Sequence, residues 1–232
     1  MNIAIIPARG GSKRIPRKNI RDFCGKPMIA HAITNALDSG CIDKVVVSTD
    51  DAEIAEVAKS YGASVPFMRP AELADDHTGT SPVVRHAIQT LLDKNWSVDY
   101  CACIYATSPL LSASCIKEGL EMLKSNPDIA YVFTAERYSF PIQRAILKTN
   151  SGGVVPFDNV GITKRSQDLE PAYHDAGQLY WGHSSTWLNP EKAIFSPESR
   201  MIVLPAHRVQ DIDTPDDWTR AEMLFKLLKN EN

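Results

Sequence analysis

The sequence predicts an α/β protein in which helices flank a mainly parallel sheet. Short apolar runs alternate with helical patterns from the start of the chain to about residue 136, which is typical of consecutive βαβ units. Glycines close the first two helical patterns, as expected where a helix ends in a loop. The chain has 232 residues, enough to bury one large core, and we expect residues 1–232 to form a single domain.

The first two βα units are expected before residue 62. A strand is predicted at residues 2–8 and a helix at residues 28–38, where apolar side chains recur at helical spacing up to Gly40. Residues 44–50 form the next apolar strand. Residues 51–61 repeat the helical spacing and are also followed by glycine.

The later units begin with a helix that the sequence marks at its start. Ser81 is placed as the N-cap and Pro82 as the first helical residue of a helix that extends to about residue 93. Residues 99–106 then resemble a buried strand. The remaining units are a helix at residues 116–124 and a strand at residues 129–136.

The alternation stops after residue 136. Residues 142–148 and 154–157 flank a glycine turn and predict a hairpin, which is followed by a polar loop. We therefore interpret about residues 137–175 as an insertion. The expected elements beyond it are strands at residues 177–181 and 201–204 and a final helix that starts at Thr214-Pro215.

Composition narrows the function classes. The net charge is −3 with both signs dispersed, so no broad basic surface indicates nucleic-acid binding. The N-terminus has no signal-peptide pattern and no window resembles a membrane span, so we expect a soluble, cytoplasmic protein. Five cysteines without a C-x-x-C pair favour neither a disulfide framework nor a zinc ribbon, and they suit a reducing compartment.

The loop after the first strand is strongly basic and contains the glycine pair Gly10-Gly11. Such glycines let backbone N–H groups close around an anion, and the natural guest for so many cations is a triphosphate. The loop has neither the ending of a P-loop nor the spaced glycines of a dinucleotide site. A solvated basic turn is the alternative. The basic residues are Arg9, Lys13, Arg14, Arg17, Lys18 and Arg21.

Two acids near the C-terminus, Asp211 and Asp213, alternate in a segment interpreted as the end of a strand. Alternate strand positions share one face, so the two carboxylates would repel each other unless a cation lies beside them. Mg²⁺ prefers such oxygen ligands and shares substrate phosphates. In the alternative interpretation, Asp213 caps the final helix and Asp211 is solvated.

Five segments together resemble the CMP-sialic acid synthetases, which are acylneuraminate cytidylyltransferases, over nearly the whole chain. The resemblance rests on IIPARGGSKRIPRKN, FCGKPMIAHAI, VVVSTDD, IYATSP and VQDIDTPDDW. It implies a Rossmann-like nucleotidyltransferase fold, CTP as co-substrate, Mg²⁺ as the metal, and an acidic nine-carbon sugar as the acceptor. It also implies a homodimer in which the insertion contributes to dimerisation and reaches towards the partner's sugar site.

The same resemblance implies roles for individual residues. Arg9 and Lys18 would hold the CTP phosphates, while Asp211 and Asp213 would hold the metal, and these four are the expected catalytic residues. The expected nucleotide-binding residues are Ala8, Arg9, Gly10, Gly11, Ser12, Lys18, Asn19, Thr80 and Ser81.

The sugar is expected to be pseudaminic acid. Tyr105 stands where sialic acid members of the family commonly have glutamine, and residues 140–145 and 166–178 look like the pseudaminic acid branch. Arg144 and Arg165 are candidates to pair with the sugar carboxylate, or else are surface cations. The expected sugar contacts are Tyr105, Thr107, Gln143, Arg144, Arg165, Tyr173, His174, Gln178 and Tyr180. N-Acetylneuraminic and legionaminic acids are the alternatives.

The implied reaction is attack of the anomeric hydroxyl on the α-phosphorus of CTP. Such phosphoryl chemistry needs positioning and charge neutralisation rather than a protein nucleophile. An aspartate, metal-bound hydroxide or water would accept the proton. A non-catalytic nucleotide-binding subunit would not need both Asp211 and Asp213, and an oxidoreductase would need a glycine fingerprint that this chain lacks.

Overall fold

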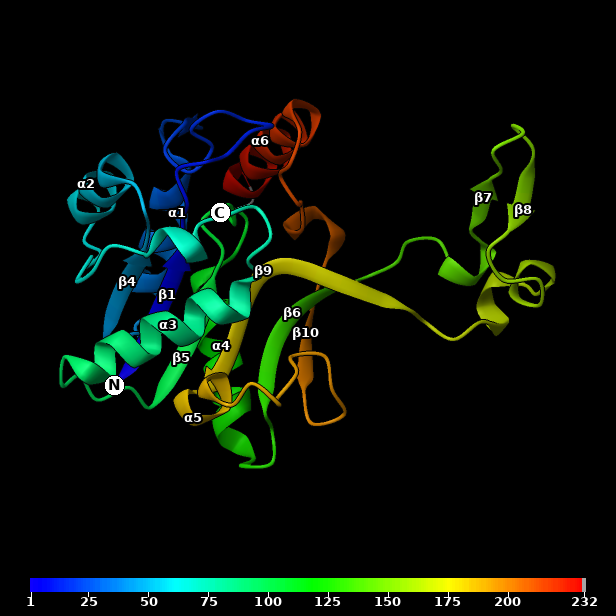
Figure 1. Cartoon of the computed structure of the whole chain (residues 1–232). Helices are drawn as coiled ribbons and strands as arrows, with labels where there is room; N and C mark the ends of the chain where they lie inside the picture. Colours follow the sequence, from blue (N-terminus) through cyan, green and yellow to red (C-terminus); the bar gives the residue numbers. More distant parts are fainter. Residues whose placement is uncertain (231–232) are drawn as a thin grey trace.

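The computed structural model describes residues 1–230, which form a six-stranded sheet flanked by helices (Figure 1). The strands of this sheet are β1 (Asn2–Pro7), β4 (Lys44–Ser48), β5 (Tyr100–Ile104), β6 (Tyr131–Arg137), β9 (Tyr173–His183) and β10 (Arg200–Leu204). Their order is β10-β6-β9-β5-β1-β4. Only β9 is antiparallel to its neighbours, so the prediction of a mainly parallel sheet is confirmed.

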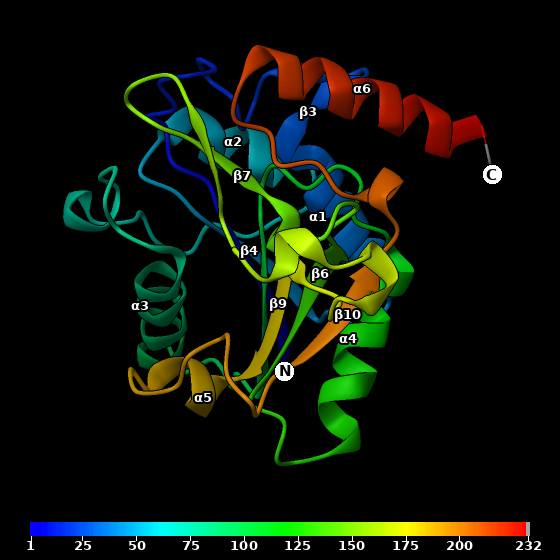
Figure 2. The same ribbon diagram turned by 90° about the vertical axis from the view of Figure 1, so that its right-hand side faces the viewer.

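Helices cover both faces of the sheet (Figure 2). The helices are α1 (Met28–Asp38), α2 (Ala52–Ser60), α3 (Thr80–Asp93), α4 (Ala113–Ser125), α5 (Ser184–Leu188) and α6 (Pro215–Asn230). One core cluster joins α1, α2 and α4 to the sheet, and a second joins α3 and α5 to its other face. A third cluster packs α6 onto the start of α1.

Short elements complete the chain. The remaining strands are β2 (Asp22–Phe23), β3 (Lys26–Pro27), β7 (Ile146–Lys148) and β8 (Val154–Pro156). The 3-10 turns are η1 (Ala71–Leu73), η2 (Ile142–Arg144), η3 (Gly161–Thr163), η4 (Ser166–Asp168) and η5 (Ala206–Arg208). The predicted hairpin is therefore present as β7–β8, but its first strand was predicted too long because η2 occupies residues 142–144.

Two helix starts differ from the prediction. Helix α3 begins at Thr80 with Gly79 as its N-cap, so Ser81 is not the cap. Pro82 is tolerated as the third helical residue because the first N–H groups of a helix have no intrahelical partner. Helix α4 begins at Ala113, three residues earlier than predicted, because the Ser112 hydroxyl accepts a hydrogen bond from the Cys115 N–H.

Strand β9 is longer than predicted and lies between β5 and β6. Its register with β6 shifts between the pairs Ala135–Asp175 and Phe133–Tyr180, so β9 carries an irregularity in mid-strand. Such an irregularity interrupts the alternation on which strand prediction depends. Helix α5, which follows β9, was not predicted, because five residues are too few to show a helical period.

Residues 138–172 connect β6 to β9 along the chain and form an arm that stands apart from the sheet (Figure 1). Its base is closed by a 3.0 Å hydrogen bond from the Tyr138 N–H to the Ala172 carbonyl. Apolar side chains are exposed along the arm. They include Phe140, Ile146, Leu147, Val154, Val155, Phe157 and Val160. The arm thus presents apolar surface that its own chain does not cover.

Two further features of residues 1–230 concern the state of the cysteines and the length and apolarity of the helices. All five cysteines are free thiols, and Cys101 and Cys103 are fully buried in the core, where burial raises the pKa of both. Within the same range, the structure contains no helix that combines the length and apolarity needed to cross a membrane.

We expect Gly182→Ala to lower the free energy of unfolding by about 1–3 kcal/mol through overpacking. A Cβ atom at Gly182 would lie 2.8 Å from the Tyr131 ring and 2.9 Å from the Trp187 indole nitrogen, and both side chains are buried. Chemical denaturation measures the difference. Gly11→Ala is the control, since a Cβ atom at Gly11 would meet no other group within 4 Å. Equal stability of the two variants would contradict the packing argument.

Candidate nucleotide and metal site

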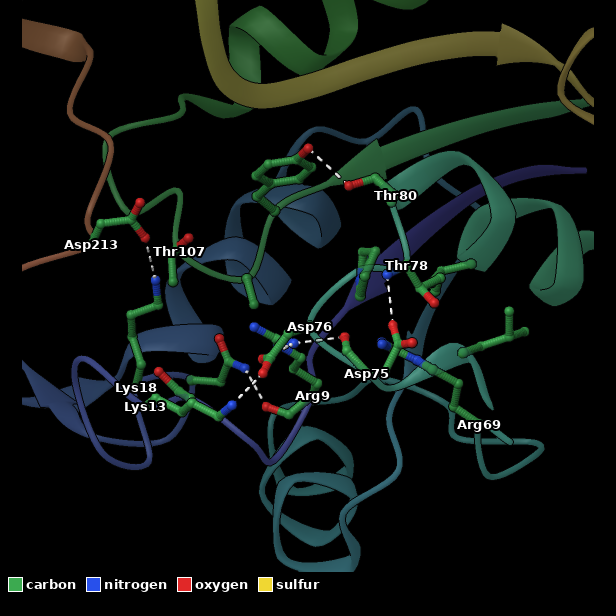
Figure 3. A pocket seen from close by; sticks show the side chains of 18 of the residues that line it. Arg9, Lys13, Lys18, Arg69, Asp75, Asp76, Thr78, Thr80, Thr107 and Asp213 are labelled. Atoms are coloured by element: carbon green, nitrogen blue, oxygen red, sulfur yellow. Dashed lines mark hydrogen bonds and ion pairs between the residues drawn. The ribbon is translucent and has the colours of Figure 1, made fainter. Parts of the chain in front are cut away.

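A cavity of about 550 Å³ opens where β1 and β5 end (Figure 3). The loop after β1 forms one wall, the segment before α3 forms another, and the turn after β5 and Asp213 complete it. Because parallel strands end at the same edge of the sheet, segments that are distant in sequence meet here. The predicted site residues that line this cavity are Arg9, Ser12, Lys18, Asn19, Thr80, Tyr105, Thr107 and Asp213.

Two cations of the basic loop are paired with Asp76, an acid on the wall that the segment before α3 forms. The Arg9 guanidinium lies 2.8 Å from the Asp76 carboxylate and donates a 2.7 Å hydrogen bond to the Asp75 carbonyl. Lys13 forms an ion pair with the same Asp76 carboxylate. An internal carboxylate therefore lies between cations that could hold a phosphate (Figure 3).

Lys18 and Asp213 meet across the cavity although they lie 195 residues apart. The Lys18 ammonium donates a 2.6 Å hydrogen bond to the Ile212 carbonyl and lies 3.3 Å from one oxygen of Asp213. The other Asp213 oxygen lies 2.8 Å from the Arg14 guanidinium. Cations on both sides thus balance the Asp213 carboxylate.

Gly10 is required by the close approach of α2. A Cβ atom there would lie 2.7 Å from the carboxylate of Asp51, the N-cap of α2. The Gly10 N–H donates a 3.0 Å hydrogen bond to Asp50 rather than pointing freely into the cavity. Nearby, Asn19 is buried and its amide donates to the Arg9 carbonyl, which holds the basic loop in place.

Arg17 anchors the middle of the basic loop to α2. Its backbone has φ of +55°, and its guanidinium binds both oxygens of Asp51 and pairs with Glu53. The Arg17 hydrogen bond, with those from α2 backbone N–H groups, lowers the pKa of Asp51 to about 2, although burial opposes the shift. The Asp51 carboxylate therefore joins the loop to the helix.

We expect the Arg17–Asp51 pair to stabilise the protein above about pH 4 and to lose its effect as pH falls towards 2. The folded pKa of Asp51 lies below the ordinary value of about 4, so the unfolded chain takes up the proton first on acidification. Denaturation at pH 5 and pH 3 should show a larger loss for the wild type than for Asp51→Asn, which can still cap α2. Equal losses would contradict this assignment.

Tyr105 forms the wall opposite the basic loop. Its hydroxyl lies 2.9 Å from the hydroxyl of Thr80, and both residues line the cavity together with Thr107. Burial raises the pKa of Tyr105, so the phenol stays protonated. This wall therefore combines an aromatic ring with neutral hydroxyl groups.

Asp211 lies beside a second depression of about 500 Å³, which it shares with Glu136, His174 and Arg220. Burial, followed by repulsion from Asp213, raises the pKa of Asp211. The two acids are thus close enough to interact electrostatically, although only Asp213 lines the first cavity. In residues 1–230 no three or more side chains of histidine, cysteine, aspartate or glutamate are grouped for metal binding.

The structure does not bring every predicted residue to the cavity. Gln143, Arg144 and Arg165 lie in the arm, where each bonds to another arm residue. His174 lies 3.6 Å from Glu136 in the second depression. Gln178 and Tyr180 are buried in β9. The other predicted residues outside the lining are Ala8, Gly10, Gly11, Ser81 and Tyr173.

Sequence reasoning missed the cavity wall that the segment between α2 and α3 forms. Arg69 is buried beside the cavity, and its guanidinium donates to the hydroxyl and carbonyl of Ser48. Asp75 and Asp76 lie on the same wall with Thr78. The available signal was the acidic pair Asp75-Asp76, shortly before the Gly79-Thr80-Ser81 turn, since a basic loop needs partners of opposite charge.

Comparison with known proteins gives one family. A family model described as Cytidylyltransferase matches residues 3–215. Pseudaminic acid cytidylyltransferase of Campylobacter jejuni is 48% identical over 226 residues, which cover 97% of each chain. CMP-N,N'-diacetyllegionaminic acid synthase of Legionella pneumophila is 34% identical and covers 97% of this chain and 96% of its own length.

Solved structures agree on the fold. A CMP:2-keto-3-deoxy-manno-octonic acid synthetase in complex with CTP superposes with a TM-score of 0.70 and 19% identity, over 100% of this chain and 99% of that chain. A 4-diphosphocytidyl-2C-methyl-D-erythritol synthase from Anaerococcus prevotii has a TM-score of 0.64 and 12% identity, over 97% of this chain and 98% of that chain. At these identities the likeness bears on the fold alone.

Proposed function

The chain belongs to the cytidylyltransferase family, and from this premise we propose that it transfers CMP from CTP to pseudaminic acid and releases diphosphate. The 48% identity to a pseudaminic acid cytidylyltransferase over nearly both full lengths supports this reaction. The observation that carries the site assignment is the cavity that Arg9, Lys18 and Asp213 line together. It combines cations for a triphosphate with a carboxylate for its metal ion.

Arg9 and Lys18 hold the phosphates of CTP in this proposal. Arg9 is now bound to Asp76, so a triphosphate competes with an internal carboxylate for the same guanidinium. Guanidinium and phosphate form strong bidentate hydrogen bonds, which favours the exchange. Asn19 and Thr80 lie in the same cavity and are proposed to contact the cytidine.

Asp211 and Asp213 fit a magnesium ion. Partial burial, followed by repulsion from Asp213, raises the pKa of Asp211, and a divalent cation would remove the repulsion. Two carboxylates suit Mg²⁺, which keeps waters and shares substrate phosphates instead of requiring a full protein cage. When bound, the ion would neutralise charge on the phosphates of CTP.

The protein's own contribution to the reaction is position and charge. The sugar hydroxyl attacks the α-phosphorus in line, the bond from that phosphorus to the bridging oxygen breaks, and diphosphate leaves. Lys18 is fixed by the Ile212 carbonyl and Arg9 by the Asp75 carbonyl, so both cations are held in place before the substrate binds. Preorganised cations stabilise charge in the transition state without reorganising.

We propose that the sugar lies against Tyr105, with help from the arm of a second subunit. Pseudaminic acid is less hydrophilic than N-acetylneuraminic acid, which suits an aromatic wall. Arg144 and Arg165 are exposed cations of the arm. The arm stands away from the sheet (Figure 1). Either arginine could pair with the sugar carboxylate if the arm crosses to a partner.

We therefore expect a homodimer held by the arm. Sedimentation should give about twice the 25.7 kDa mass of one chain. Phe157→Asp in the arm should produce monomers. Phe157 is exposed, and the substitution would place a charge in an apolar interface. Met223→Asp, at an equally exposed apolar position in α6, is the matched control and should remain dimeric. A wild-type monomer would refute the assembly.

Release of diphosphate tests the proposed reaction. CTP and Mg²⁺ are supplied with pseudaminic, legionaminic or N-acetylneuraminic acid in separate assays, and kcat/KM is compared. Pseudaminic acid should give the highest value. A higher value for either other sugar would overturn the sugar assignment but keep the cytidylyltransferase assignment, whereas no turnover with any of them would remove the function.

Because the proposed reaction uses CTP, and the cysteines are free, we propose a cytoplasmic location for the protein.

A further inference from the structure

Tyr105, the aromatic wall of the cavity, is backed by a second tyrosine that does not line it. The rings of Tyr105 and Tyr180 are 5.4 Å apart between centroids, and Tyr180 is buried in β9. The Tyr180 hydroxyl donates a 2.5 Å hydrogen bond to one oxygen of Asp175. The contacts thus run from Thr80 at the cavity through Tyr105 and the buried Tyr180 to Asp175, which is exposed on the other side.

The contact between Tyr180 and Asp175 exists because β9 is irregular. In a regular strand, residues five apart point to opposite faces and lie about 16 Å apart. The register shift against β6 shortens this path. Gly177 makes the bend with φ of +63°, and its N–H donates a 3.0 Å hydrogen bond to the other oxygen of Asp175. One carboxylate therefore closes the bend and holds Tyr180.

The chemistry of Asp175 makes it hard to replace. A carboxylate accepts hydrogen bonds with both oxygens, whereas the amide of an asparagine has one acceptor. Asp175 accepts with both oxygens, from Tyr180 and from Gly177. The Tyr180 hydroxyl directs its proton to Asp175, so its oxygen can only accept further hydrogen bonds. Burial, followed by the neighbouring Tyr105 and Asp175, raises the pKa of Tyr180, so the proton is retained.

We propose that Asp175 is a positioning residue for the sugar: it fixes Tyr180, which in turn fixes the ring of Tyr105 against which the sugar binds. The proposal rests on the proposed function, since Tyr105 is taken to contact the sugar. Asp175 has no contact with the basic loop or with Asp213 that would affect CTP. Its link to the nucleotide side runs through Tyr105 to the Thr80 hydroxyl, so its effect on the sugar should exceed its effect on CTP.

Kinetics of Asp175→Asn and Tyr180→Phe test the proposal. Each variant should raise KM for pseudaminic acid about tenfold and change KM for CTP much less, because the aromatic wall loosens while the basic loop is intact and the wall reaches the nucleotide side through the Thr80 hydroxyl. The preference for pseudaminic over N-acetylneuraminic acid should fall in parallel. Tyr131→Phe is the matched control: it removes a buried tyrosine hydroxyl that bonds the Thr186 carbonyl, away from the cavity, and should change neither KM.

A double-mutant cycle separates positioning from direct contact. If Asp175 acts through Tyr180, Asp175→Asn should have little further effect on the sugar KM in the Tyr180→Phe background. Additive effects would overturn the proposal, because Asp175 would then act by a route other than Tyr180. An unchanged sugar KM in both single variants, or an equal rise in KM for CTP, would also overturn it. A wild type inactive with pseudaminic acid would instead remove the proposed function.

Discussion

Asp213→Asn is expected to lower kcat by about 100- to 1000-fold while the fold stays intact. The Asp213 carboxylate lies 3.3 Å from Lys18 and 2.8 Å from Arg14, and in the proposed reaction it binds the metal ion. A neutral amide of the same size keeps the packing but loses the charge that a cation requires. Diphosphate release over a range of Mg²⁺ concentrations measures the loss, and circular dichroism checks the fold.

The control for this prediction is Asp216→Asn. Asp216 is an exposed acid in the first turn of α6, close in sequence but outside the cavity lining. Its variant should retain nearly the wild-type rate. Asp211→Asn should resemble Asp213→Asn, because Asp211 is the second proposed ligand. If both variants turn over near the normal rate at saturating Mg²⁺, the metal assignment is wrong.

Lys18→Ala is expected to reduce kcat/KM for CTP by about 100-fold or more, equivalent to about 3 kcal/mol of transition-state stabilisation. Lys18 is held firmly at the cavity: its side chain is 18% exposed and its ammonium is fixed by the Ile212 carbonyl. Arg9→Ala should also be impaired, since Arg9 is the second phosphate contact.

Lys59→Ala is the matched control for the lysine variant. Lys59 lies in α2 and pairs with Glu56 at the surface, so its loss should leave CTP kinetics unchanged. If both Lys18→Ala and Arg9→Ala show normal CTP kinetics, the basic loop has been misinterpreted. A loss confined to kcat would place the cations in the transition state rather than in ground-state binding.

The sequence predicted that Lys18 and Asp213 lie at the same edge of the sheet, but for Asp213 the reason was wrong. Residues 209–213 form no strand, so Asp211 and Asp213 do not alternate on one strand face, and only Asp213 lines the first cavity. The second wall was not foreseeable in the same way. Arg69 and Asp76 lie between α2 and α3 in a segment whose one helical element is the 3-10 turn η1, so no periodic pattern indicates which way their side chains point.

Gly10 shows why a motif alone can assign the wrong reason to a residue. The glycine pair was expected to expose N–H groups to an anion, and the structure gives Gly10 a different constraint, because Asp51 leaves no room for a Cβ atom. The bend in β9 was equally hidden. Its glycine, Gly177, was taken as the start of a strand, and the contact of Tyr180 with Asp175 depends on a register that only the assembled sheet determines.

The closed base of the arm has an evolutionary consequence. Arg137 pairs with Tyr173 as the last step of the β6–β9 ladder, and the next bond, from Tyr138 to Ala172, seals the entrance to the arm. Residues 138–172 are therefore one long hairpin connection between β6 and β9. Lengthening such a loop costs little conformational entropy. Insertions and substitutions can accumulate there without shifting the strand register, so the arm can diverge in sequence and length while the sheet that carries the nucleotide cavity keeps its pairing.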